Sequence, residues 1–216
     1  MAQWVVFGFG NYVSDIFDII TSRGGRVETV VMNIVPTDEQ LGNLKRRISL
    51  LGYDVNIIEL AQFRPQDGES YSLGFVSGRE KLVHNLKQSY QIGFSSLVHP
   101  TAYLAAGVST GEGVCIGPHA VLAPNCRVGD FSMINRSSSI GHDVVLGDFS
   151  TVGPGVTIAG MVKIGRKTTV GIGATIVNDI SVGENSVVGA GSVVLDDVPS
   201  GVVVVGTPAR ILRRND

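Results

Sequence analysis

A histidine directly followed by a carboxylate is the feature of this chain that most plainly predicts chemistry. His142 and Asp143 are consecutive residues. An imidazole takes up a proton near neutral pH, and an adjacent carboxylate can hold the ring in one orientation. The pair therefore predicts a general base. The other three histidines, His84, His99 and His119, are interpreted as structural or surface residues.

The element that must position His142 is a repeat of six residues. From Val98 to Val194 every sixth residue is aliphatic except Thr110, and the fifth residue of each hexad is small or β-branched. This period fits neither a helix nor a hairpin meander, and predicts a parallel β-helix with three short strands per coil and coils about 4.8 Å apart. Both restricted positions are expected to point inward. The many second-position glycines are expected to permit corner backbone angles that a Cβ resists.

The repeat places His142 at the third position of its hexad, where a side chain projects outward. The residue eighteen positions later, one coil along, is Gly160, whose exposed backbone makes it a candidate oxyanion donor. Neighbours on a strand point in opposite directions, so Asp143 reaches the imidazole only if the two residues form a corner. The alternative interpretation of His142 is a solvated surface histidine.

The first 95 residues predict a different unit. Strands and helices are expected to alternate, which indicates a small, Rossmann-like parallel α/β domain. The expected strands are 4–7, 27–32, 54–58 and 73–76, and the expected helices are 11–23, 36–51 and 79–88. Gly8, Gly10 and Asn11 follow the first strand, where backbone amides can hold a phosphate. The third glycine of the full dinucleotide motif is replaced by Val13, so a simple tight turn is the alternative.

The composition excludes several classes of protein. The formal net charge is −2, which does not favour nucleic acid as a partner. Cys115 and Cys126 form no CxxC pair and are too few for a disulfide scaffold. The first strand is not preceded by a basic segment, and no apolar run is long enough for a membrane span. These features predict a cytoplasmic protein.

Four segments carry a family resemblance. They are Leu97-Val98-His99-Pro100-Thr101-Ala102, Ile134-Asn135, Ile140-Gly141-His142-Asp143 and Gly206-Thr207-Pro208-Ala209-Arg210. With the preceding α/β domain, the chain resembles the hexapeptide-repeat acyltransferases, in the branch of bacterial sugar-nucleotide N-acetyltransferases and sialic acid O-acetyltransferases. The resemblance implies a left-handed β-helix, acetyl-CoA as co-substrate and no metal. It also implies a homotrimer, with active sites between neighbouring prisms.

The resemblance also implies residue roles. His142 is the general base, Asp143 orients it, and the amide of Gly160 meets the thioester carbonyl. Asn135 lies near the acceptor, and the CoA arm passes Ile172 and Ala190. Arg210, with Arg213 and Arg214, is a candidate for the CoA phosphates, with a solvated basic tail as the alternative.

The predicted organisation is a nucleotide-sugar-binding domain at 1–95, an acetyltransferase β-helix at 96–204 and a basic tail at 205–216. The predicted reaction moves an acetyl group from acetyl-CoA to an amino group of a nucleotide-linked sugar. O-acetylation of a sugar or sialic acid hydroxyl, acetylation of serine, and a non-catalytic scaffold are alternatives. A carbonic anhydrase needs three metal-binding histidines, and the usual pair spaced five residues apart is missing.

Two departures from the family pattern leave the acceptor open. Thr151 stands where some members have a second histidine, and Met32-Asn33-Ile34 stands where many have paired acidic residues.

Overall fold

The computed structural model describes residues 2–8, 10, 12–74 and 78–215 of the chain. It divides into two compact units, residues 1–97 and 98–216. In the part of the chain that the structure describes, no helix is both long and apolar enough to cross a membrane.

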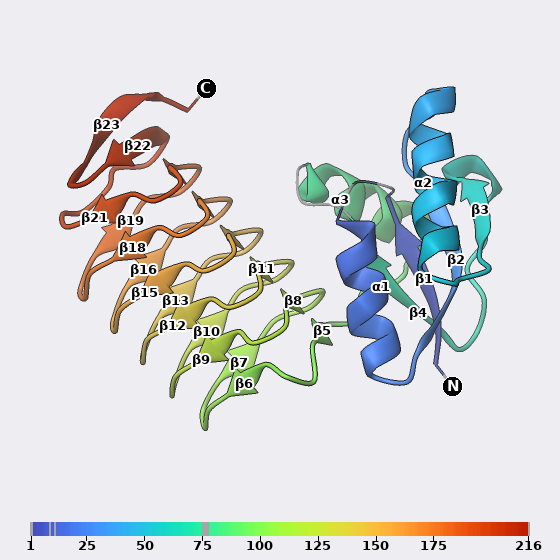
Figure 1. Cartoon of the computed structure of the whole chain (residues 1–216), viewed down its shortest axis with the longest axis horizontal. Coiled ribbons are helices and arrows are strands. Elements are labelled where there is room, and N and C mark those ends of the chain that lie inside the picture. The colour runs from blue at the N-terminus through green and yellow to red at the C-terminus, as the bar shows by residue number, and fades with distance from the viewer. Residues whose placement is uncertain (1, 9, 11, 75–77, 216) are drawn as a thin grey trace. The chain divides into compact units, whose positions relative to one another are not determined.

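The first unit is a parallel sheet of four strands in the order β3-β2-β1-β4 with three α-helices (Figure 1). Its elements are β1 (Gln3–Phe7), α1 (Val13–Ser22), β2 (Arg26–Met32), α2 (Asp38–Leu50), β3 (Asn56–Glu59), a 3-10 turn (Leu60–Gln62), β4 (Glu69–Leu73) and α3 (Arg79–Tyr90). The predicted Rossmann-like α/β unit is confirmed, since β1 lies in the middle and its neighbours run parallel to it.

Local sequence signals explain these elements. Helix α1 buries Val13, Ile16 and Phe17 on one face, as the helical spacing predicts. Helix α2 begins at a capping box, in which Thr37 and Gln40 each bond the backbone of the other. The prediction of a strand at 73–76 was wrong in position. The strand ends at Leu73, because its alternation begins earlier, at Glu69, and Val76 lies outside the described residues.

The second unit is the predicted β-helix, built of three sheets whose strands run parallel apart from the last one, β23 (Figure 1). The first sheet holds β7 (Ser109–Thr110), β10 (Arg127–Val128), β13 (Val145–Leu146), β16 (Lys163–Ile164) and β19 (Ser181–Val182). The second holds β6 (Tyr103–Leu104), β9 (Val121–Leu122), β12 (Ser139–Ile140), β15 (Thr157–Ile158), β18 (Thr175–Ile176) and β21 (Val193–Val194). The third holds β5 (Leu97–Val98), β8 (Cys115–Ile116), β11 (Met133–Ile134), β14 (Thr151–Val152), β17 (Thr169–Val170), β20 (Val187–Val188), β22 (Val202–Gly206) and β23 (Ala209–Arg214).

Stacking follows the predicted register of eighteen residues per coil. Ile140 pairs with Ile158, and Val152 pairs with Val170. The first residue of each hexad is buried from Ile116 to Val194, and so is the fifth from Val114 to Val198. The inward-facing positions are therefore confirmed, and the core is a column of small and branched side chains.

The expected role of the second-position glycines was wrong. The positive backbone angles occur at the fourth position, as in Asn125 (φ 65), Asp143 (φ 59) and Gly155 (φ 64). The second-position glycines are needed because the coils stack closely. A Cβ on Gly147 would lie 2.7 Å from the backbone nitrogen of Arg166, in the next coil.

Inward-facing hydroxyl groups at the fifth position tie each coil to the next. Ser132 donates to the carbonyl of Gly147, Ser138 to that of Gly153, and Thr168 to that of Gly183. A buried hydroxyl needs such a partner, and each bond also fixes the corner that carries the accepting carbonyl. Polar fifth positions therefore strengthen the stack.

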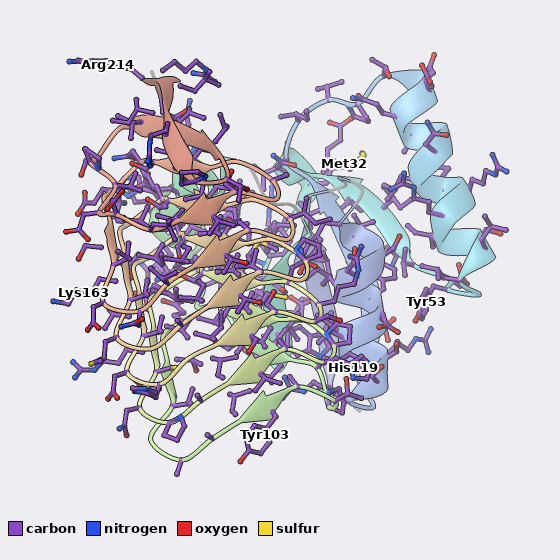
Figure 2. The ribbon with its side chains drawn as sticks, turned by 60° about the vertical axis from the view of Figure 1, so that its left-hand side comes forward. Met32, Tyr53, Tyr103, His119, Lys163 and Arg214 are labelled. Atoms are coloured by element: carbon purple, nitrogen blue, oxygen red, sulfur yellow. The ribbon has the colours of Figure 1, made fainter. Side chains whose placement is uncertain are left out.

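The C-terminal residues form a hairpin and not the separate tail expected at 205–216. Strand β22 continues the third sheet beside β20, and β23 pairs antiparallel with β22. Val202, Val203 and Val204 are buried, so the start of β22 extends the core of the β-helix. The side chains of Lys163 and Arg214 point away from the β-helix (Figure 2).

Candidate active site

His142 and Asp143 form a corner of the β-helix between β12 and β13. Asp143 adopts φ 59, which turns its side chain to the same side as the imidazole. His142 Nδ1 lies 2.8 Å from Asp143 Oδ2, and the two side chains are about half exposed, at 57% and 50%. The carboxylate accepts from Nδ1–H, so Nε2 of the neutral ring is left as the basic atom.

Gly160 lies one coil along, directly against this imidazole. A Cβ built on Gly160 would lie 2.6 Å from His142 Nε2 and 2.8 Å from Cε1. The backbone N–H of Met161 donates to the carbonyl of His142 at 2.8 Å, which locks the two corners together. The predicted neighbours are thus brought together, and any side chain at residue 160 would displace the ring.

Gly160 occupies the third position of its hexad, as Glu112 and Asp130 do in theirs. Amides at the equivalent third position point along the surface toward the residue one coil on, as Glu112 N–H does toward Asp130 and Asp130 N–H toward Asp148. Among the described residues no protein acceptor is bonded to Gly160 N–H. An amide held beside a basic imidazole in this way is suited to stabilise a developing oxyanion.

Asn125 completes the corner, although it was not among the predicted site residues. Its Nδ2 donates to Asp143 Oδ1 at 3.2 Å. The hydrogen bonds from His142 and Asn125 lower the pKa of the Asp143 carboxyl below its usual range. The signal was available, since Asn125 stands eighteen residues before Asp143 and therefore one coil below it.

Asn135, Ile172 and Ala190 lie at a different corner, between the third and second sheets. Ile172 and Ala190 are exposed and occupy the same corner position in successive coils, whereas Asn135 is half-buried, with Oδ1 accepting from Arg136 N–H. One side of the prism separates this corner from His142. A single chain therefore does not bring these three predicted residues to the base.

Arg210 lies near the end of the column that carries the base. Its Nη1 is 3.7 Å from Asp196 Oδ2, with both side chains exposed. Asp196 occupies the third position of its hexad, as His142 and Gly160 do in theirs. The arginine is therefore placed beyond Gly160 on the same corner, at the C-terminal end of the prism.

The repeat also matches a known family model. Residues 125–160 and 161–196 match the bacterial transferase hexapeptide (six repeats) family. These matched residues lie within the β-helix and carry its six-residue repeat. No curated protein matches the chain as a sequence relative.

Solved structures share the fold over nearly the whole chain. A mutant of perosamine N-acetyltransferase from Caulobacter crescentus, in complex with CoA and GDP-perosamine, is 24% identical with a TM-score of 0.83, over 97% of this chain and 96% of that one. The acetyltransferase domain of PglB from Neisseria gonorrhoeae, in complex with acetyl coenzyme A, is 22% identical with a TM-score of 0.81, over 98% and 99%. WeeI from Acinetobacter baumannii is 25% identical with a TM-score of 0.81, over 97% and 99%. These likenesses place the chain among the left-handed β-helix proteins that carry a small α/β domain.

Both cysteines of the β-helix are buried, and Cys126 belongs to its inward-facing core. Cys126 Sγ donates to the carbonyl of Gly141, and burial raises the pKa of its thiol. A protonated thiol inside the prism is no acyl acceptor, because the thiolate is the nucleophile.

His99 and His119 both take part in hydrogen bonds with Thr101. His99 Nδ1 accepts from the backbone N–H of Thr101 at 3.1 Å and lies 2.8 Å from its hydroxyl. The N–H of His119 bonds to the same hydroxyl at 3.1 Å. Within residues 2–8, 10, 12–74 and 78–215, no three His, Cys, Asp or Glu side chains gather as a metal site would require.

The backbone groups of Gly8 and Gly10, after the first strand, form hydrogen bonds within the first unit. Gly8 N–H donates to the carbonyl of Val31 at 2.8 Å, and the carbonyl of Gly10 accepts from Val13 N–H at 3.0 Å. The Gly8 amide is therefore not available to a phosphate. Asn11 lies outside the described residues.

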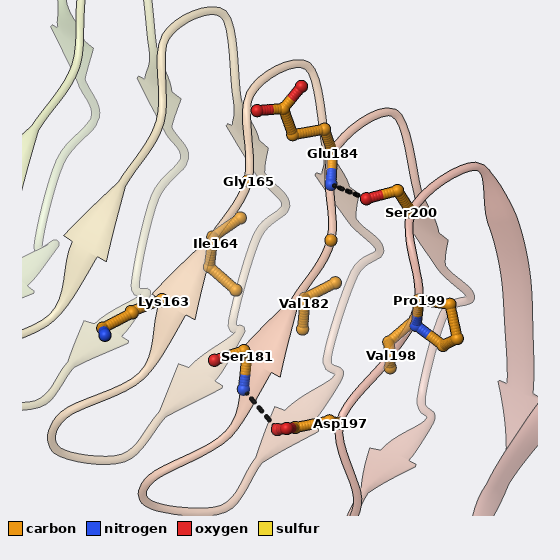
Figure 3. A pocket seen from close by; sticks show the side chains of 11 residues that line it. Lys163, Ile164, Gly165, Ser181, Val182, Glu184, Asp197, Val198, Pro199 and Ser200 are labelled. Carbon is orange, nitrogen blue, oxygen red and sulfur yellow. Dashed lines mark hydrogen bonds between the residues drawn. The ribbon is translucent and has the colours of Figure 1, made fainter.

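A surface depression of about 470 Å³ lies away from the His142 corner (Figure 3). It runs from Lys163 to Ser200 at the end of the first sheet. Asp197 accepts from Ser181 N–H at 2.7 Å, and Ser200 accepts from Glu184 N–H at 3.1 Å, as the dashed lines in Figure 3 show. These hydrogen bonds join the segment that follows the last hexad to the coil before it. We therefore interpret the depression as a consequence of how the repeat ends.

Proposed function

We propose that this protein transfers an acetyl group from acetyl-CoA to the amino group of a nucleotide-linked sugar. The observation that carries the proposal is the His142–Asp143 pair with Gly160 packed against the ring. The similar structures named above support it, since one holds CoA with GDP-perosamine and another holds acetyl coenzyme A. The base, the amide donor and the fold all suit acyl transfer.

The proposed reaction is a direct transfer. The acceptor nitrogen attacks the thioester carbon, so that a C–N bond forms, and His142 Nε2 takes the proton that the nitrogen loses. Gly160 N–H donates to the oxyanion of the tetrahedral intermediate. The C–S bond then breaks, and the imidazolium returns the proton to the sulfur, giving the amide and free CoA. Asp143 stabilises the imidazolium by accepting from Nδ1–H.

We further propose that a second copy of the chain supplies the other wall of the site. Asn135, Ile172 and Ala190 stand at a corner that cannot reach His142 of the same chain. Three prisms arranged around one axis would bring this corner of each copy to the His142 corner of the next. The CoA arm would then run past Ile172 and Ala190, with Arg210 near its phosphates. The first unit is proposed to hold the nucleotide part of the acceptor.

The test is release of free thiol from acetyl-CoA with a panel of acceptors. The panel holds UDP- and GDP-linked 4-amino-sugars, other nucleotide amino-sugars, sialic acid and serine. Turnover of a nucleotide amino-sugar that falls by roughly two to four orders of magnitude in His142→Ala supports the proposal. His84→Ala, a histidine exposed on α3, is the matched control and should keep full activity.

Two results contradict the proposal. Turnover of sialic acid or serine alone would assign a different acceptor. Binding of acetyl-CoA without turnover of any panel member would favour a non-catalytic scaffold.

A further inference from the structure

Asn125, Asp143 and His142 form a connected chain of hydrogen bonds at one corner. Asn125 Nδ2 donates to one oxygen of Asp143 at 3.2 Å, and the other oxygen faces His142 Nδ1 at 2.8 Å. A carboxylate only accepts, so the amide group of Asn125 must face it with its nitrogen. The two carboxylate oxygens thus have different partners, one in the coil below and one on the neighbouring residue.

The backbone fixes this chain in place. Asn125 and Asp143 both take positive φ angles, 65 and 59, and occupy the same corner position in successive coils. The backbone N–H of Asp143 donates to the carbonyl of Pro124 at 3.0 Å, which holds the two corners in register. Below Asn125 stands Gly107, where a Cβ would come within 2.6 Å of Asn125 Oδ1. The absence of a side chain at Gly107 leaves room for this rotamer of Asn125.

We infer that Asn125 is a positioning residue for the base, acting through Asp143; the inference rests on the proposed function of His142. A carboxylate held by His142 alone is free to rotate about its Cβ–Cγ bond. The bond from Asn125 fixes the carboxylate plane and so selects the tautomer that carries the proton on Nδ1. In water a neutral imidazole does not hold that tautomer by itself, and base catalysis from Nε2 requires it.

The charged groups around the carboxylate are few. His142 and Arg127 both favour its ionised form, and the Cys126 thiol beneath the corner stays protonated. Met161, one coil above, carries no charge. A change from amide to carboxylate at residue 125 would therefore add the nearest negative charge to the pair.

The experiment compares Asn125→Gly with Asn125→Asp in the full chain. Glycine suits the positive φ of residue 125, so this variant removes the amide without backbone strain. Asn185→Gly is the matched control, since Asn185 also has a positive φ of 52, but in a different corner of the prism. The readouts are histidine tautomer NMR of His142, the pH profile of kcat/KM, and KM for acetyl-CoA.

Asn125→Gly should move His142 toward the Nε2–H tautomer and lower kcat on the order of tenfold with KM for acetyl-CoA unchanged. Asn125→Asp should move the acid limb of the profile to higher pH, because a second carboxylate favours the protonated cluster. Asn185→Gly should match the wild type in every readout.

A wild-type tautomer and acid limb in both Asn125 variants would overturn the inference. An Asn125-dependent tautomer in a protein that acetylates no member of the panel would instead overturn the proposed function and leave the positioning role of Asn125 standing. The NMR measurement needs no acceptor, so the two failures are distinguishable.

Discussion

The Cα of Gly160 packs against the imidazole of His142, one coil away. A methyl group at residue 160 would meet Nε2, Cε1 and Cδ2 of the ring at 2.6, 2.8 and 3.0 Å. Contacts this short cannot persist, so the ring and an added side chain exclude each other. The glycine therefore fixes where the base stands, and in the proposed mechanism it also supplies the amide that meets the oxyanion.

Gly160→Ala should lower kcat by at least about a hundredfold, because the added methyl group displaces the imidazole from its bond to Asp143. Steady-state thiol release measures this loss. The exposed imidazole can swing outward, so the thermal midpoint should stay within a few degrees of the wild type. Gly42→Ala on α2 is the control, since a Cβ there meets nothing within 4 Å. A Gly160→Ala enzyme with normal turnover would show that Nε2 is not the basic atom.

Asp143→Asn should lower kcat roughly tenfold to a hundredfold and move the acid limb of kcat/KM to lower pH. The neutral amide no longer stabilises the imidazolium, so the protonated ring becomes easier to deprotonate. Asparagine accepts the positive φ of this residue, and an exposed ion pair adds little stability, so urea unfolding should be unchanged. A shift of the limb to higher pH would contradict the assigned role.

The lowered pKa of Asp143 determines the pH range over which its carboxylate stays ionised beside His142. The pKa of this carboxyl is lowered, so its charged form is present above its usual range and is lost only as the pH falls through the lowered value. No titration of Asp143 should therefore appear in a wild-type rate profile between about pH 5 and pH 9. An added acidic step that disappears in Asp143→Asn would refute this.

Mixing two inactive variants tests whether the site lies between copies. His142→Ala removes the base corner, and Ile172→Glu places a charge on the exposed corner proposed to line the CoA arm. Chains that are unfolded and refolded together should assemble at random, so about a quarter of the interfaces would pair two unaltered corners. Thiol release should recover to about that fraction of the wild-type rate. No recovery from a mixture shown by mass measurement to be mixed oligomers would place each site within one chain.

The two kinds of corner glycine should respond differently to substitution. Gly147→Ala should cost about 1–3 kcal/mol in the free energy of unfolding, because the methyl group is driven into the backbone of Arg166. Gly155→Asn should cost much less, because its Cβ meets open space and asparagine tolerates the positive φ of 64. Urea unfolding of the two variants gives the comparison. Equal costs would mean that corner strain, not coil spacing, dictates these glycines.

The period of the sequence determined most of the fold. With three hexads in each coil, residues eighteen positions apart stack, as Ile140 and Ile158 do. The same count placed Gly160 and His142 in neighbouring coils. In the first unit, the apolar runs along the chain predicted the parallel sheet. The start of β4 was not predicted, because polar residues such as Glu69 alternate with apolar ones in this strand.

Only the tertiary structure decided which backbone position turns each corner. The positive φ of Asp143 brings its carboxylate to the imidazole, although consecutive strand residues would point apart. The tertiary structure also showed that Asn125 bonds to the Asp143 carboxylate and that Gly8 N–H is used within the sheet. A period fixes which residues share a column, because spacing is set by the repeat. The direction of a hydrogen bond and the reach of a side chain depend on backbone angles and rotamers. These are set by the packing of the coils and cannot be read from the six-residue period.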